Sequence, residues 1–339
     1  MRIIIDAMGG DNAPRAVVEG VYKAKSKLGH EVALTLVGNE KEINAAAEEL
    51  CISLDGIDIV HTEEKIGMEE APSLVVRGKP ECSMAVGMKL LKPDNGYGEV
   101  GDAFVSAGST GALHVGSSVL VGRIKGVKRS CIAALLPFPT PLLLLDSGAN
   151  SAVTPDFFVS WAVLGSVYMK HVLGCESPRV GLVNNGAEET KGTELYQEAH
   201  QLMKKADVGF VGNVEARDIP NGVCDVLVAD GFTGNIVLKL VEGMGGFMMK
   251  TLKNIFSANI KTKLAYLFVK PQLRGLKKSF DSSEHGGAPI LGLKRPVIKA
   301  HGSADADTIC NAVIQAALCV REDVCGVMER ELGKLENSK

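Results

Sequence analysis

Small and polar residues gather in clusters that directly follow short apolar runs of the chain. When such a turn opens a helix, its backbone N–H groups and the positive end of the helix dipole bind phosphate without a cationic side chain. Residues 106–111 and 230–235 each precede a helical pattern and are the best candidates, although a glycine-rich turn alone is more often a simple tight turn. The predicted phosphate-binding residues are Asp6, Gly9, Gly10, Ser106, Gly108, Thr110, Gly231, Thr233 and Gly234.

Several other kinds of site lack their usual sequence support. No G-x-x-x-x-G-K-[ST] loop occurs, and no G-x-G-x-x-G follows a predicted strand, which argues against a nucleotide. No G-x-S-x-G elbow is present, and the 8 cysteines are scattered singly, without a C-x-x-C pair or a neighbouring histidine. The sequence therefore predicts no metal, no cofactor and no disulfide framework.

Inorganic phosphate is a dianion near neutral pH, so it is a nucleophile that needs little help from a general base. A protein that uses it has to hold it and to stabilise the oxyanion of a tetrahedral intermediate. Amide side chains in the turns, a lysine as counter-charge and a histidine at a strand end would suit this chemistry. Asparagine in a turn also commonly caps a helix or adopts a left-handed conformation, which is the alternative interpretation. The predicted catalytic residues are Asn185, Lys191, Asn213, Asp230, Asn235 and His301.

Short strand patterns alternate with helical patterns from the first residue, which is typical of an α/β protein with a mainly parallel twisted sheet flanked by helices. The 339 residues suit a single α/β unit, either undivided or built of two intimately joined lobes. The carboxyl ends of parallel strands share one edge of a sheet, so we expect the polar clusters to converge there. Strands are predicted at residues 3–6, 32–37, 57–61, 103–106, 132–136, 142–146, 180–183, 208–211, 226–229 and 297–300.

Helices are expected between these strands. The first begins after Asn12, which is a plausible N-cap, and contains Pro14 in its first turn. The predicted helices cover residues 13–28, 40–50, 83–91, 110–124, 155–172, 188–204, 235–250 and 305–324.

Residues 243–280 form a basic amphipathic segment that contains no aspartate or glutamate, although the whole chain has a net charge of -3. Apolar residues recur in it at intervals of three and four, and Pro271 is expected to end the helix. Such a helix binds a membrane surface or an acidic protein, and the alternative is an ordinary packing or dimer helix. The overall charge argues against a nucleic-acid partner. The predicted membrane-binding residues are Phe256, Ile260, Lys261, Lys263, Leu264, Leu267 and Phe268.

The polar clusters taken together resemble the PlsX family of phosphate acyltransferases. The segments that carry the resemblance extend over most of the chain, so as a set they are highly specific. They are DAMGGDNAP at 6–14, GLVNNG at 181–186 with ETKG at 189–192, GNVEARD at 212–218, DGFTGN at 230–235 and GGAPILG at 286–292.

The resemblance implies transfer of a long acyl group from acyl carrier protein to inorganic phosphate. The acyl phosphate would then pass to a downstream membrane acyltransferase of phospholipid synthesis. The resemblance also implies a homodimer with a fold like that of phosphotransacetylases and of isocitrate or isopropylmalate dehydrogenases. It further implies a cytoplasmic protein that attaches peripherally to the anionic inner face of the cell membrane.

Two alternatives stay open at this point. One is an NAD- and metal-dependent hydroxyacid dehydrogenase of similar fold, in which Asp6, Asp11, Asp146 or Asp230 would bind the metal, although the dinucleotide glycine pattern is missing. The other is a non-catalytic, membrane-associated adaptor that docks a carrier protein.

Overall fold

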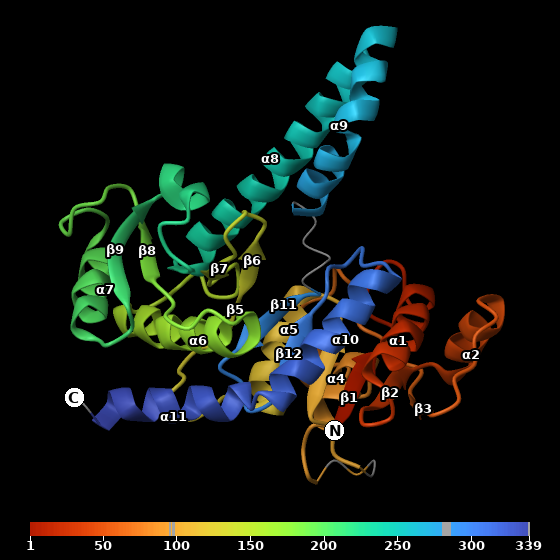
Figure 1. Cartoon of the computed structure of the whole chain (residues 1–339). Coiled ribbons are helices and arrows are strands. Elements are labelled where there is room, and N and C mark those ends of the chain that lie inside the picture. Colours follow the sequence, from red (N-terminus) through yellow and green to blue (C-terminus); the bar gives the residue numbers. More distant parts are fainter. Residues whose placement is uncertain (95, 97–98, 280–285, 338–339) are drawn as a thin grey trace.

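The fold is an α/β architecture with two sheets, seen in a computed structural model (Figure 1). The structure describes residues 1–94, 96, 99–279 and 286–337, without the side chains of residues 272, 274–279, 336 and 337. Residue 280, the last of the predicted amphipathic segment, lies outside the described residues.

The first sheet contains strands from both the amino-terminal and the carboxy-terminal parts of the described chain. Its strands are parallel except for β11, which runs antiparallel to both of its neighbours. The order across the sheet is β3 (Ile57–His61), β2 (Ala33–Gly38), β1 (Arg2–Asp6), β4 (Ala103–Ser106), β12 (Val297–Lys299), β11 (Ala288–Leu291) and β5 (Cys131–Ile132).

The second sheet is built from the middle of the chain, and only β6 is antiparallel to its neighbour. Residues 132–136, predicted as one strand, divide at Ala133 between the two sheets, so this segment joins them. The order is β6 (Ala134–Leu136), β7 (Leu142–Leu145), β10 (Val226–Val228), β8 (Val180–Asn184) and β9 (Phe210–Glu215).

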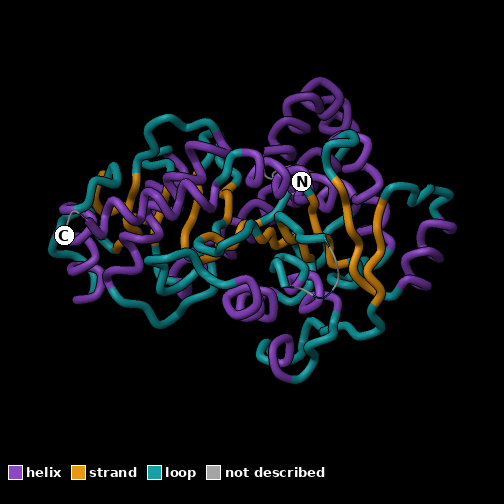
Figure 2. The backbone as a smooth tube through the Cα atoms, turned by 90° about the horizontal axis from the view of Figure 1, so that it is seen from below, coloured by secondary structure: helices purple, strands orange, loops and turns teal. Residues whose placement is uncertain are grey.

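Helices cover both faces of the strands, as Figure 2 shows from below. One hydrophobic core is continuous between the sheets, because buried Ile3 and Val105 of the first sheet belong to the same cluster as Leu143 and Trp161 of the second lobe. The helices of this core are α1 (Arg15–Leu28), α2 (Glu40–Glu49), α6 (Pro155–Leu173), α7 (Glu194–Lys205), α10 (Ala306–Arg321) and α11 (Val324–Asn337).

The opposite face of the first sheet is covered by shorter helices. They are α3 (Leu74–Arg77), α4 (Ser83–Lys89) and α5 (Thr110–Gly116), and a π-helical turn, Ser117–Val121, continues α5. On the second sheet, a 3-10 helix (Ala216–Asn221) and the start of α8 (Gly231–Ser257) cover the other face.

Helices α8 and α9 (Ile260–Ser279) form a hairpin that stands away from the rest of the molecule (Figure 1). The amphipathic segment is therefore two helices instead of one continuous helix. Pro271 lies inside α9, so the prediction that it ends the helix is wrong. Among the described residues, no helix is both long and apolar enough to cross a lipid bilayer.

Other predicted elements agree with the structure to within a few residues, with some exceptions. Strand β11 and helices α3 and α11 were not predicted, and the predicted N-cap Asn12 is wrong, because α1 begins after Pro14. Instead, the Asn12 side chain donates to the carbonyl oxygens of Ser303 and Ala304.

Candidate functional site

The order in which strands are added to the first sheet reverses at the boundary between β1 and β4. Two of the polar clusters lie at this boundary. Strand β1 leads through α1 to β2 on one side, whereas β4 pairs with β1 on the other side. Ligands of open α/β sheets bind at such a reversal, beyond the carboxyl ends of the strands. Residues 6–11 follow β1 and residues 106–111 follow β4, so the structure brings these two clusters together.

Asp6 is buried and holds the two turns against each other. Its carboxylate accepts hydrogen bonds from the hydroxyls of Ser83 and Ser106, each at 2.7 Å, and from the N–H of Met8 at 3.1 Å. Burial raises the pKa of Asp6, and these hydrogen bonds oppose that shift. Asp6 therefore positions the turns, and its negative charge would repel a phosphate in direct contact.

The glycines of these turns allow a close approach of the backbone. A Cβ atom on Gly9 would lie 2.5 Å from Oδ2 of Asp6 and 2.7 Å from the nitrogen of Gly108. Gly10 has a φ of 103°, a conformation that favours glycine. The N–H of Gly108 donates to the hydroxyl of Ser106 at 3.0 Å.

The amino end of α5 is open. None of the described residues accepts a hydrogen bond from the N–H of Thr110 or Gly111. The N-cap residue Ser109 is 7% exposed, and its hydroxyl makes no hydrogen bond to any residue in the described part of the chain. The Ser109 hydroxyl is not itself fully buried, so together with the N–H groups of Thr110 and Gly111 it is accessible to an oxygen-rich ligand.

The amino end of α8 is closed by its own residues. The Asp230 carboxylate caps it by accepting from the N–H groups of Phe232 at 2.9 Å and Thr233 at 3.0 Å. The N–H of Gly234 donates to the carbonyl of Asp230, and that of Gly231 donates to the carbonyl of Asn150. All four amino-terminal N–H groups are thus satisfied, and this turn has no free backbone donor for phosphate.

The remaining lone pairs of Asp230 are also engaged. Its Oδ2 accepts from the hydroxyls of Thr233, at 2.7 Å, and Tyr196. Burial alone would raise the pKa of Asp230, but these hydrogen bonds lower it overall. Burial and the adjacent carboxylate raise the pKa of Tyr196. The structure thus shows Asp230 as a helix cap, and its catalytic role stays a prediction.

Hydrogen bonds join α5 to the turns of the second sheet. His114 lies on α5, and its Nε2 is 3.2 Å from the carbonyl oxygen of Ser130. The same oxygen accepts from the Asn150 amide at 2.8 Å, and Asn150 in turn donates to Asp146. Burial lowers the pKa of His114, so this link is made with a neutral imidazole. The exposed Asn235 side chain lies beside Gly148 of this turn.

The predicted residues on the loop after β8 lie further along the second sheet. Asn213 is half-buried on edge strand β9, where its amide oxygen is 3.0 Å from Nδ1 of His200 and its nitrogen donates to the carbonyl of Glu188 at 2.8 Å. This amide therefore supports the loop of residues 184–192. The side chains of Asn185 and Lys191 on that loop are exposed.

Lys299 and His301, at and just after the carboxyl end of β12, lie at the same edge of the first sheet as these turns. Nδ1 of His301 accepts a hydrogen bond from the N–H of Ser303 at 3.2 Å, so the neutral ring carries its proton on Nε2. Lys299 is 7% exposed, and its ammonium donates to the carbonyls of Ala107, at 3.2 Å, and Ala300. Sequence analysis did not select Lys299, because a lysine at a strand end gives no sign of burial.

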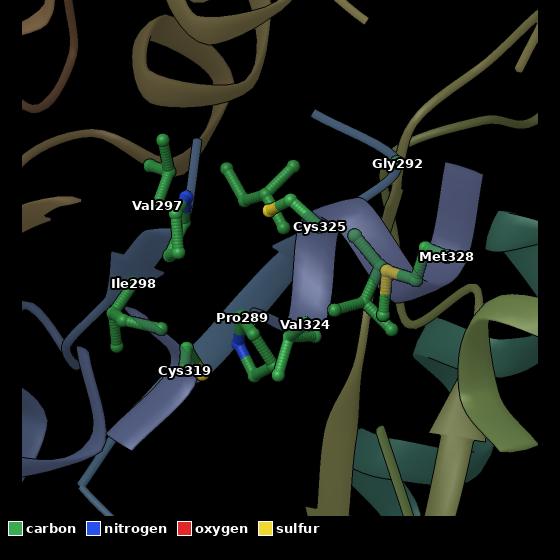
Figure 3. Close-up of a pocket in the computed structure, with 11 residues that line it drawn as sticks. Pro289, Gly292, Val297, Ile298, Cys319, Val324, Cys325 and Met328 are labelled. Atoms are coloured by element: carbon green, nitrogen blue, oxygen red, sulfur yellow. The ribbon is translucent and has the colours of Figure 1, made fainter. Parts of the chain in front are cut away.

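Two cavities lie away from these turns. A small apolar one, of about 10 Å³, is enclosed by β11, β12, α10 and α11 (Figure 3), where Cys319, Val324 and Met328 are among its lining residues. Another, of about 200 Å³, lies between α6 and α10. Within the described ranges, no group of three or more histidine, cysteine or acidic side chains could hold a metal ion.

Comparison with known proteins identifies the family. Residues 1–327 match the family model described as "Fatty acid synthesis protein". A phosphate acyltransferase from Shouchella clausii is 44% identical over 99% of each chain. One from Thermoanaerobacterium thermosaccharolyticum is 43% identical over 98% of this chain and 97% of that protein. The chain belongs to the phosphate acyltransferase family. It is therefore an acyltransferase, as the sequence predicted.

Solved structures confirm the predicted fold class. A phosphotransacetylase from Streptococcus pyogenes superposes with a TM-score of 0.61 at 16% identity, covering 95% of this chain and 94% of that chain. One from Staphylococcus aureus gives a TM-score of 0.60 at 15% identity, with 94% of both chains covered. The mainly parallel α/β fold resembling phosphotransacetylases is thus confirmed.

Proposed function

We propose that this phosphate acyltransferase takes a long-chain acyl group from the thioester of acyl carrier protein and transfers it by direct attack of bound phosphate. The observation that carries the proposal is the open amino end of α5, with the Ser109 hydroxyl that caps no N–H, at the point where the strand order of the first sheet reverses. Family membership supports phosphate as the acceptor.

In this mechanism the N–H groups of Thr110 and Gly111 and the hydroxyl of Ser109 hold the phosphate. One phosphate oxygen attacks the thioester carbonyl carbon and forms a C–O bond, while the electron pair of the C=O bond moves to its oxygen. That pair then re-forms the C=O bond as the C–S bond breaks and its electrons leave with the sulfur. An ordinary thiol has a pKa of roughly 8 to 9, so it can leave as the thiolate without a general acid. The products are acyl phosphate and the free thiol of the carrier.

Nε2–H of His301 and the amide of Asn235 are the proposed oxyanion donors. Both side chains are exposed, His301 just after β12 and Asn235 in the first turns of α8. A neutral imidazole whose Nδ1 is occupied keeps an N–H to donate, which suits it to stabilise the developing charge.

An acyl-enzyme on cysteine is disfavoured by the environment of the thiols. Cys82 precedes α4 close to Asp6, and burial raises its pKa. Burial also raises the pKa of Cys319 to about 12. A thiol with a raised pKa is protonated at neutral pH and is a poor nucleophile, so bound phosphate is the proposed nucleophile.

The α8–α9 hairpin is proposed to bind the anionic inner face of the cell membrane from the cytoplasm. On α9, Ile260 is 76% exposed and Phe268 is 82% exposed, with Lys261 and Lys263 exposed nearby. Leu264 and Leu267 are also exposed, whereas Phe256 on α8 is half-buried and packs at a tilt against Tyr266, with ring centroids 5.6 Å apart. Apolar side chains flanked by lysines are typical of membrane-surface helices.

A homodimer, built from single α/β units with two intimately joined lobes, is proposed from a second apolar surface. Phe232, Ile236, Leu240 and Met244 recur every four residues on α8 and are 49% to 64% exposed. An exposed stripe of this length is unusual on a monomer. In a symmetric dimer one stripe would cover its copy.

The decisive experiment follows free-thiol release from a long-chain acyl thioester of acyl carrier protein, with and without inorganic phosphate. Release that depends on phosphate and yields acyl phosphate supports the proposal. Labelled protein trapped in the absence of phosphate would instead reveal an acyl-enzyme and contradict direct attack. Release independent of phosphate would contradict the proposed acceptor.

The membrane proposal is tested by flotation with vesicles that contain phosphatidylglycerol. Charge reversal at Lys261 and Lys263 should abolish binding, because each basic residue near an anionic surface contributes about 1 kcal/mol. Charge reversal at Lys41 and Lys125, which lie outside the hairpin, is the matched control. Retained binding by the hairpin variant would favour a packing role for α9.

A further inference from the structure

Lys299 is a buried lysine at the rim of the first sheet, and the mechanism above does not use it. It ends β12 directly beside Ser106, its partner in the parallel register with β4. Its side chain donates to the carbonyl oxygen of Ala107, which belongs to the turn of residues 106–111 that leads into α5. The ammonium thus lies against the backbone of the proposed phosphate turn.

The charge of Lys299 has no counter-ion in the described part of the chain. Two of its N–H groups donate to the carbonyls of Ala107 and Ala300, and no described acceptor takes the third. No carboxylate oxygen of a described residue comes within 4 Å of the ammonium, although the charges of Asp6 and Asp11 reach it at longer range. Asp6 is already occupied by Ser83, Ser106 and Met8.

A buried and unpaired ammonium is costly, and such groups are normally paired or lose their proton. Here burial lowers the pKa of Lys299 to about 8, so it keeps its charge at neutral pH. The titratable groups around it are Asp6 and Asp11, which favour the charged form, and His301, which is separated from it by one residue. The site therefore holds a positive charge that lacks an anion.

We propose that the phosphate bound at the α5 turn is the counter-ion of Lys299, which makes Lys299 a substrate-binding residue of this enzyme. This inference rests on the proposed function of the same turn. Backbone N–H groups act on an anion through partial charges, whereas an ammonium beside them adds a full positive charge and strengthens the preference for the dianion. Lys299 thereby selects the more nucleophilic form of phosphate.

The pH dependence of phosphate binding follows from this pairing. Below pH 8 the free enzyme carries the protonated Lys299, and phosphate is increasingly the dianion above its second pKa, which is roughly 6 to 7. Above pH 8 the lysine must take up a proton when phosphate binds, so the affinity should fall about tenfold per pH unit. Phosphate affinity should be highest between these two values.

The experiment compares the wild-type chain with Lys299→Met in the thiol-release assay, at varied phosphate and fixed acyl carrier protein thioester. We expect the KM for phosphate to rise about 10- to 100-fold, with the KM for the thioester within about twofold of wild type. In wild type the KM for phosphate should rise as the pH increases above 8, and this rise should be absent in the variant. Lys41→Met, which removes an exposed lysine of α2, is the matched control and should match wild type.

Thermal unfolding gives a second measure that does not need turnover. Removing an uncompensated buried charge should not lower the Tm of the phosphate-free protein, but it should remove the rise in Tm that inorganic phosphate gives to wild type. A folded Lys299→Met variant with a wild-type phosphate KM would overturn the proposal. A wild-type phosphate affinity that stays constant from pH 7 to pH 9.5 would also overturn it, whether or not the variant folds.

These outcomes separate this inference from the function on which it rests. If wild type releases thiol without any dependence on phosphate, the proposed function fails. If wild type needs phosphate but Lys299→Met keeps its phosphate KM, only the role of Lys299 fails.

Discussion

The two turns that open α5 and α8 look alike in sequence but differ in how their backbone N–H groups are used. Both follow a parallel strand, and both contain two glycines and a threonine. At α8 the carboxylate of Asp230 and two backbone carbonyls occupy the first four N–H groups. At α5 the cap is a serine whose hydroxyl reaches no N–H, so the helix end stays open. An acidic N-cap completes a helix, whereas an open helix end is available to an external anion.

The largest effect is expected from Gly234→Ala, which tests how tightly the α8 turn is closed. A Cβ there would lie 2.0 Å from the carbonyl oxygen of Asp146, a backbone atom that cannot move aside. We expect a loss of about 3 kcal/mol or more in the free energy of unfolding, measured by urea denaturation.

Two glycine variants serve as controls for Gly234→Ala. Gly243→Ala on the same helix meets nothing within 4 Å and should stabilise the protein by up to about 1 kcal/mol. Gly108→Ala in the α5 turn meets Cε of Met84 at 2.6 Å, the flexible end of a side chain, and should be tolerated better than Gly234→Ala. Equal losses in the free energy of unfolding for Gly108→Ala and Gly234→Ala would contradict the proposed difference between the open α5 turn and the closed α8 turn.

An intermediate effect is expected from Ser109→Ala at the open turn. If the hydroxyl binds phosphate, its removal should raise the KM for phosphate about tenfold, because a hydrogen bond to a charged group is worth about 1.5 kcal/mol or more. The stability of the phosphate-free protein should not fall, since the hydroxyl has no partner there. Thr233→Ala is the counterpart at the closed turn: it loses a hydrogen bond to Asp230 and should lower stability without changing the phosphate KM. A wild-type phosphate KM in Ser109→Ala would exclude this hydroxyl from the site.

Sequence patterns were sufficient to predict most of the strands, their alternation with helices and the polar clusters at the strand ends. They could not distinguish the two turns. The difference is that the Asp230 side chain accepts hydrogen bonds from N–H groups of its helix, whereas the Ser109 side chain accepts none. Tyr196 is a second example. It lies 34 residues before Asp230 and completes the α8 cap through a contact that only the folded chain creates.

The basic hairpin and Lys299 show two further limits of sequence analysis. The break between α8 and α9 at Ala258 and Asn259 was not predicted, because it contains no glycine or proline to mark it. Lys299 was overlooked because burial of a polar strand end depends on strand order, which places β12 between β4 and β11. Both are consequences of long-range packing rather than of local propensity.

The smallest effect is expected from Asp230→Asn, which keeps an amide cap but removes the charge. Because hydrogen bonds lower the pKa of Asp230 in the folded protein, the charge stabilises the fold at pH values above the unfolded pKa of about 4, and this contribution is lost as pH falls through the folded pKa. At pH 7 the variant should lose about 1 kcal/mol of stability. In urea titrations the difference from wild type should shrink as the pH is lowered below 4. The phosphate KM and kcat should stay within about threefold of wild type, because the capping carboxylate has no lone pair left for substrate. A hundredfold fall in kcat with the fold intact would instead make Asp230 a catalytic residue, and the closed turn would then belong to the active site.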